Sequence, residues 1–206
     1  ESVFAQFLNL VSVSEDKQGN LIDNYAAFRY AFAFLVHDYK DQANARAVIA
    51  VDQFSTSHEA NGGTGKSLFC QAVKQLRRMG YEDGKTLKMD SNFLFQSIDL
   101  DSQVILIDDV RHNFDFSQLY PAITGDMVIE RKGRNRFILP FQSSPKFVIT
   151  TNYALLENGE SHQRRWFILP FNNFFHLGHT PLEEFGKRLF VEWDDLEWQR
   201  FYDFTI

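Results

Sequence analysis

Four short apolar runs stand out along the chain, and each ends in or is preceded by polar residues. They are rich in Val, Ile and Phe and too short for typical helices, so they predict buried strands. They read RAVIAVD over residues 46–52, SQVILIDD over 102–109, KFVITTN over 146–152 and RRWFILPF over 164–171. A fifth segment, MVIERKGRNRFILPF over residues 127–141, has apolar arms on both sides of a basic turn and predicts a hairpin.

Helical patterns fill most of the remaining chain. Residues 1 to about 45 are expected to be helical, because the stretch from Leu21 to Lys40 is rich in Ala, Phe and Leu and contains no Pro or Gly. After residue 66 the apolar residues return at helical spacing, and Gly80 is expected to end that helix. A further helix with an aromatic face is expected from Pro181 onward. Strands that alternate with helices predict an α/β fold around a mainly parallel sheet.

The composition of the 206 residues narrows the class of protein. With 44% hydrophobic residues and 22 Phe, the chain can bury a good core. The net charge of −6 argues against a surface that coats DNA nonspecifically, although a local basic element remains possible. One cysteine, Cys70, suits a reducing compartment, and no signal peptide or membrane-length apolar segment is visible. The expected location is the cytoplasm. Because it lacks an initial Met and stops abruptly, we expect the chain to be a piece of a longer protein.

The stretch EANGGTGKSLF, residues 59–69, predicts a phosphate-binding loop. Small residues let consecutive backbone N–H groups turn toward a phosphate, the lysine neutralises the β and γ oxygens, and the next hydroxyl binds Mg²⁺. The pattern wants Gly six residues before the lysine, where this chain has Ala60, also a small residue. The alternative is a flexible turn before a helix, but a predicted strand before the loop and a helix after it favour the phosphate-binding loop.

Polar residues end two of the predicted strands. Asp108 and Asp109 follow Val104–Ile107 about 40 residues after the loop, and Asn152 ends the run KFVITTN. A buried strand delivers its last residue rigidly to the edge of the sheet where phosphates and Mg²⁺ bind. Asp and Asn also begin ordinary turns, which is the alternative. Their order behind a phosphate loop favours the functional interpretation, in which Asp108 holds the metal and Asp109 and Asn152 face the attacking water or the γ-phosphate.

In this order, ANGGTGKS, VILIDD, a basic hairpin, VITTN and a following arginine resemble the superfamily 3 helicases, and SLF, ITGD and SPKFVITTNY resemble the helicase part of phage-type primase-helicases. The resemblance covers about residues 46–171. It implies an AAA+-type three-layer P-loop core, with ATP and Mg²⁺, in a ring of identical subunits, expected to be a hexamer, that moves on single-stranded DNA. It also implies a possible primase domain or other replication proteins as partners, and a phage or mobile-element origin.

The resemblance also implies roles for individual residues. The nucleotide would contact the loop residues Ala60, Asn61, Gly62, Gly63, Thr64, Gly65, Lys66, Ser67 and Leu68, with Mg²⁺ on Ser67 and Asp108. Lys132 would grip DNA at the hairpin tip, with Arg131, Arg134 and Arg136 beside it; an ordinary solvated turn is the alternative. Arg165, or its neighbour Arg164, would act on the γ-phosphate of the adjacent subunit, unless the pair is only a charged strand end.

Three functions remain open from the sequence. The favoured one is an ATP-dependent replicative DNA helicase, with an N-terminal helical segment over residues 1–45 that could form an oligomerisation collar, an ATPase core over 46–175 and a truncated C-terminal helical segment over 176–206. The first alternative is a nucleotide-binding DNA initiator or oligomerisation module that does not unwind processively. The second is a small-molecule kinase of the P-loop type, which the basic hairpin and the strand ending in Asn argue against.

Overall fold

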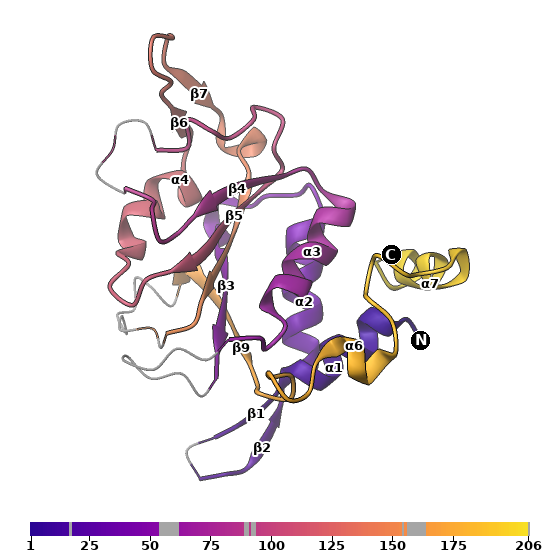
Figure 1. The fold of residues 1–206 in the computed structure, drawn as a ribbon. Coiled ribbons are helices and arrows are strands. Elements are labelled where there is room, and N and C mark those ends of the chain that lie inside the picture. The colour runs from indigo at the N-terminus through magenta and orange to yellow at the C-terminus, as the bar shows by residue number, and fades with distance from the viewer. Residues whose placement is uncertain are drawn as a thin grey trace.

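A computed structural model describes residues 1–16, 18–53, 62–88, 91, 94–153, 155 and 164–205. The chain folds around one sheet, with helices packed on it and two small hairpins (Figure 1). The elements are α1 (Val3–Ser12), β1 (Val13–Glu15), β2 (Leu21–Asp23), α2 (Tyr25–Val36), η1 (Gln42–Asn44), β3 (Ala47–Asp52), α3 (Lys66–Leu76), β4 (Met79–Asp83), β5 (Val104–Val110), η2 (Phe116–Leu119), α4 (Tyr120–Thr124), β6 (Met127–Ile129), β7 (Phe137–Leu139), η3 (Phe141–Ser143), β8 (Lys146–Thr151), β9 (Trp166–Phe171), α6 (Pro181–Phe185) and α7 (Asp195–Thr205).

The central sheet has five parallel strands in the order β4-β5-β8-β3-β9. Every residue of β3 and β8 is buried, as expected for inner strands of a parallel sheet that is covered on both faces. The predicted α/β class with a mainly parallel sheet and a P-loop type of core is confirmed. Because β5, β8 and β3 are neighbours and run the same way, their carboxyl ends meet at one edge.

Two hydrophobic clusters cover the two faces of the sheet. On one face, α1, α2, α3 and α7 contribute an aromatic cluster that includes Phe4, Phe28, Phe69 and Phe201, all fully buried. On the other face, η2, α4 and the β6–β7 hairpin contribute a mainly aliphatic cluster around Ile105. Most of the buried Phe side chains lie in the cluster on the helical face of the sheet, and each of them buries a large area.

The C-terminal helix packs on the N-terminal helix. Glu197 of α7 is buried, and its Oε1 accepts a hydrogen bond of 2.5 Å from the backbone N–H of Val3. This carboxylate therefore occupies the start of α1, where unpaired N–H groups favour a negative charge. Both chain ends consequently lie on the same side of the molecule (Figure 1). Residues at both ends contribute to the cluster that covers the sheet, and the three predicted domain boundaries stay predictions.

Three predictions about secondary structure are wrong. The chain from Pro181 onward is not one helix, because α6 ends at Phe185 and α7 begins only at Asp195. Residues 1–45 are not wholly helical, because β1 and β2 form an antiparallel hairpin between α1 and α2, which begins only at Tyr25. Gly80 does not end a helix: α3 ends at Leu76, and Gly80 lies inside β4. As an edge strand, β4 is partly exposed and needs no continuous apolar run, so its sequence MGYED carries little strand signal.

The β6–β7 hairpin forms as predicted, with Met127 paired to Leu139. It projects from the end of the sheet opposite the first turn of α3 (Figure 1). In the part of the chain that the structure describes, no helix has both the length and the apolar character needed to cross a membrane.

Candidate functional site

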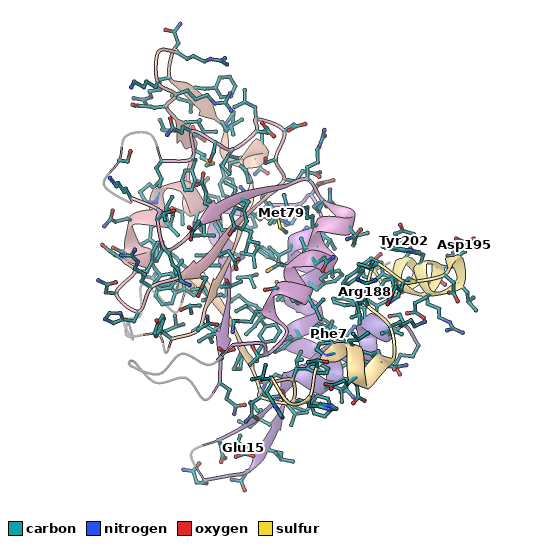
Figure 2. The ribbon with its side chains drawn as sticks, viewed as in Figure 1. Phe7, Glu15, Met79, Arg188, Asp195 and Tyr202 are labelled. Carbon is teal, nitrogen blue, oxygen red and sulfur yellow. The ribbon has the colours of Figure 1, made fainter. Side chains whose placement is uncertain are left out.

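The glycine-rich loop leads directly into α3, as the sequence predicts. Gly63 and Gly65 adopt φ values of 82° and 103°, which is the left-handed region that glycine adopts without strain. At Gly65 there is also no room for a side chain, because a Cβ would lie 2.8 Å from two ring carbons of Phe7. Phe7 lies on α1 (Figure 2), so the N-terminal helix supports the back of the loop.

Lys66 begins α3, and its ammonium points to the end of strand β3. The Lys66 side chain is buried, and its Nζ forms an ion pair with Asp52 Oδ1. Thr64 completes the group: its hydroxyl donates to Asp52 Oδ1 at 2.5 Å and accepts from Lys66 Nζ at 3.1 Å. Burial lowers the pKa of Lys66, and the hydrogen bond and charge of Asp52 oppose that shift. The ammonium of Lys66, which is expected to bind the phosphates of a nucleotide, therefore already has a carboxylate partner.

Asp108 and the strand β8 are joined through Thr150. The Thr150 hydroxyl donates to Asp108 Oδ1 at 2.6 Å and accepts from the backbone N–H of Asp109 at 2.8 Å. The hydroxyl thus fixes the Asp108 carboxylate on the carboxyl edge of the sheet. Thr150 is part of the run VITTN, but the sequence interpretation assigned only its last residue, Asn152.

Asp109 reaches the same site because β5 is irregular there. The pairing of β5 with β8 shifts register between Ile107 and Val110, and Asp109 has a φ of 56°. In a regular strand Asp108 and Asp109 would point to opposite faces, and a bulge can redirect one of two consecutive side chains. As a result, Asn152 Nδ2 donates to Asp109 Oδ1 at 2.9 Å. The structure brings together all three strand-end residues that the sequence singled out.

These groups line one cavity of about 380 Å³. Its described lining consists of Gly62, Gly63, Thr64, Gly65, Lys66, Ser67, Leu68, Asp108, Asp109, Thr150, Asn152 and Pro181. Ala60 and Asn61, also predicted to contact a nucleotide, lie outside the described residues. Pro181, the first residue of α6, was not predicted, and its sequence neighbourhood carries no signal for such a place.

The donor set fits a magnesium–phosphate ligand. Ser67 and Asp108 present a hydroxyl and a carboxylate to the same cavity, and Mg²⁺ prefers such oxygen ligands. Among the described residues, no group of three or more His, Cys, Asp or Glu could hold a metal ion alone. Mg²⁺ commonly takes one or two protein ligands and completes its shell with water and substrate phosphates, so Ser67 and Asp108 suffice.

Arg164 and Arg165 lie at the other end of the sheet. They directly precede β9, whose first residue, Trp166, pairs with Ala47, whereas Phe171 at its far end pairs with Asp52 near the loop. The six residues of this strand correspond to roughly 20 Å. The Arg165 guanidinium stacks over the Tyr120 ring at 4.7 Å, while Arg164 is exposed. The structure therefore does not bring either arginine into the cavity of its own chain.

The four cations of the hairpin have different surroundings. Arg131 Nη2 donates to the backbone oxygen of Ile98 at 2.6 Å and so ties the base of the hairpin to the core. Lys132, Arg134 and Arg136 are exposed near the tip. The basic surface predicted for DNA is thus presented by three of the four side chains.

Two charged residues of the site were missed by the sequence interpretation. Asp52 ends the run RAVIAVD, so an acid at a strand end was visible as a signal. Lys85 follows β4 and forms an ion pair with Asp109 Oδ2. No signal pointed to Lys85, because the strand before it was interpreted as the end of a helix.

Solved structures with a similar fold include two of the NrS-1 C-terminal region. One has a TM-score of 0.58 and is 17% identical, covering 100% of this chain and 44% of that one. The other has a TM-score of 0.57 at 17% identity, covering 100% of this chain and 43% of that one. The present chain thus spans less than half of either. A JCV helicase structure matches less well, at a TM-score of 0.45 and 14% identity, covering 98% of this chain and 65% of that one.

Sequence comparisons add a family without a known activity. A search of the curated proteins finds no match. The sequence model described as "Family of unknown function (DUF5906)" matches residues 58–165, which is more than half of the 206 residues and includes the glycine-rich loop, both aspartates and Asn152. The chain belongs to the DUF5906 family.

Proposed function

We propose that this chain is the motor part of an ATP-dependent DNA helicase. The observation that carries the proposal is the convergence of a glycine-rich loop, Lys66, Ser67, two aspartates and Asn152 on one cavity, at the end of the sheet opposite a basic hairpin. The first part of this arrangement suits phosphoryl transfer to water, and the second suits a contact with a nucleic-acid backbone.

Each residue of the cavity has a role in this proposal. The N–H groups of the loop and of the first turn of α3 bind the phosphates, and Lys66 neutralises their oxygens. Ser67 and Asp108 hold Mg²⁺, which would neutralise charge that develops on the phosphates. Asp109 orients the attacking water, and Asn152 contacts that water or the γ-phosphate. For Lys66 to reach a phosphate, its ammonium has to leave Asp52 or share its protons between the two.

The proposed partners follow from the hairpin and from Arg165. Lys132, Arg134 and Arg136 would line the pore of a ring, proposed to be a hexamer, and bind single-stranded DNA. Because Arg165 lies about one strand length from its own cavity, it is proposed to act on the neighbouring subunit's nucleotide. A primase domain in the same polypeptide, a phage or mobile-element origin and a place in the host cytoplasm belong to this proposal.

The proposal is tested by nucleotide hydrolysis and strand separation. We expect the wild type to hydrolyse ATP with Mg²⁺, faster when single-stranded DNA is present, and to separate a forked duplex. Lys66→Ala should abolish hydrolysis, because it removes the charge at the β and γ oxygens. Lys74→Ala is the matched control, since Lys74 is exposed on the same helix and does not line the cavity.

The possible outcomes separate the candidate functions. Full turnover by Lys66→Ala would contradict the phosphate-loop assignment. Hydrolysis that DNA stimulates without any strand separation would favour the initiator module. Transfer of the γ-phosphate to a small molecule instead of water would favour the kinase.

A further inference from the structure

Lys85 is held at the edge of the proposed catalytic site by its own turn. The preceding residue, Gly84, donates its backbone N–H to the backbone oxygen of Asp108 at 2.7 Å. A Cβ at Gly84 would meet Val110 Cγ1 at 2.5 Å and that same Asp108 oxygen at 2.7 Å, so the turn lies directly against the irregular part of β5. The Lys85 N–H is also fixed, because it donates to Asp83 Oδ1 at 2.9 Å. The backbone therefore places Lys85 next to Asp109.

The side chain of Lys85 completes the surroundings of the Asp109 carboxylate. Lys85 Nζ pairs with Oδ2, and Asn152 donates to Oδ1 at 2.9 Å. Each oxygen of the carboxylate therefore has its own donor, from a different element of the fold. The hydrogen bond and the charge of Asp109 raise the pKa of Lys85, so this lysine stays cationic at neutral pH.

Two donors matter at this position because the backbone alone does not fix the carboxylate. Asp109 has a left-handed φ of 56°, and its side chain is 31% exposed. With Asn152 as the only partner, the carboxylate could rotate about its χ2 angle, which has a broad energy profile. A donor on each oxygen holds the carboxylate plane in one orientation. A carboxylate that positions a water molecule depends on such an orientation, since misplacement by about 1 Å can cost a large part of a rate.

The ion pair contributes little as a stabilising contact. The Lys85 side chain is 56% exposed, and exposed ion pairs are worth little to folding. Its effect is therefore expected on the geometry of Asp109 and not on the stability of the fold. We infer that Lys85 is a positioning residue for hydrolysis, which aims the Asp109 carboxylate at the attacking water. This inference rests on the proposed function of the same site.

The test compares three variants of the full chain in steady-state ATP hydrolysis. Lys85→Gln removes the charge, Lys85→Arg keeps a cation that can reach Asp109, and Lys88→Gln changes a lysine of the same turn region. Lys88 is exposed and makes no ion pair within the described part of the chain. We expect Lys85→Gln to lower kcat about tenfold, a fraction of what a positioned base contributes, without changing KM. Lys85→Arg should stay within about threefold of the wild type, because it keeps the charge and the donor.

Two further measurements separate positioning from folding and from nucleotide binding. The melting temperature and the affinity for a fluorescent ADP analogue should be the same in all variants. An unchanged or increased kcat in Lys85→Gln would overturn the inference and leave the proposed function intact, as would equal losses in the Gln and Arg variants. A wild type that hydrolyses no nucleotide, with or without single-stranded DNA, would overturn the proposed function and this inference together.

Discussion

The ion pair between Lys66 and Asp52 predicts a large energetic coupling between the two residues. Their side chains are 8% and 2% exposed, so both charges are withdrawn from water and depend on each other. Asp52→Asn keeps the shape and an acceptor for Thr64 but leaves the ammonium without its counter-charge. Lys66→Met keeps most of the apolar stem and leaves the carboxylate without its counter-charge.

The magnitude follows from the burial of the pair. Removing one partner of a buried ion pair costs about 3–5 kcal/mol, while replacing both can be nearly neutral. A domain of this kind is stable by about 5–15 kcal/mol, so either single substitution would remove a large share. With a slope of about 2 kcal/mol per M, the urea midpoint would fall by about 1.5–2.5 M. The double variant Asp52→Asn/Lys66→Met should recover most of that loss.

The measurement is a double-mutant cycle from urea unfolding of the four proteins without nucleotide. Its pH dependence adds an independent check. Burial already lowers the pKa of Lys66 below 10.5, and without Asp52 it should fall further. A lysine whose folded pKa is lowered destabilises the fold below that pKa, and the penalty is relieved as the pH rises toward 10.5. The deficit of Asp52→Asn should therefore shrink at alkaline pH. Additive losses in the cycle, with no dependence on pH, would refute the coupling.

Two predictions concern the basic hairpin and Arg165 of the proposed motor. Lys132→Ala should weaken binding of single-stranded DNA equally for all sequences, as measured by fluorescence anisotropy. It should also lower the slope of log affinity against log salt by about 0.7 for each DNA phosphate that the hairpin no longer neutralises. An unchanged slope would mean that the hairpin is an ordinary charged turn. Arg165→Ala should bind ATP but hydrolyse it poorly, and mixing it with Lys66→Ala should restore some turnover, because one interface then joins an intact arginine to an intact loop. Failure of this rescue in intact oligomers would contradict action between subunits.

The sequence predicted the parts of the fold that depend on local patterns of residues. The inner strands β3, β5 and β8 are continuous apolar runs because both faces of the sheet are covered, so their positions and their polar ends could be read directly. The loop at Lys66 could be predicted equally well, since its glycines are needed for its backbone shape. The edge strand β4 and the β1–β2 hairpin were not, because they are short and partly or largely exposed.

The parts of the site that were missed depend on tertiary contacts. The extra residue at Asp109 changes how β5 pairs with β8, and such a shift has no local sequence signal. Lys85 comes close to Asp109 only because β4 lies beside β5. Asp52 could be seen as an acid at a strand end, but its pairing with Lys66 is a contact between β3 and α3 that no local pattern predicts.

The contact of Phe7 with Gly65 links the shape of the loop to a helix almost 60 residues earlier in the chain. Segments of a protein open locally with their own free energies, and a helix that packs on the outside of a sheet can open more easily than the central strands. When α1 separates, the loop loses the aromatic surface behind Gly65. A ligand that binds only the supported loop must then favour the docked helix, and the docked helix must strengthen ligand binding by the same factor. Amide hydrogens of α1 would therefore exchange more slowly with solvent when a nucleotide is bound, although no residue of α1 lines the described cavity.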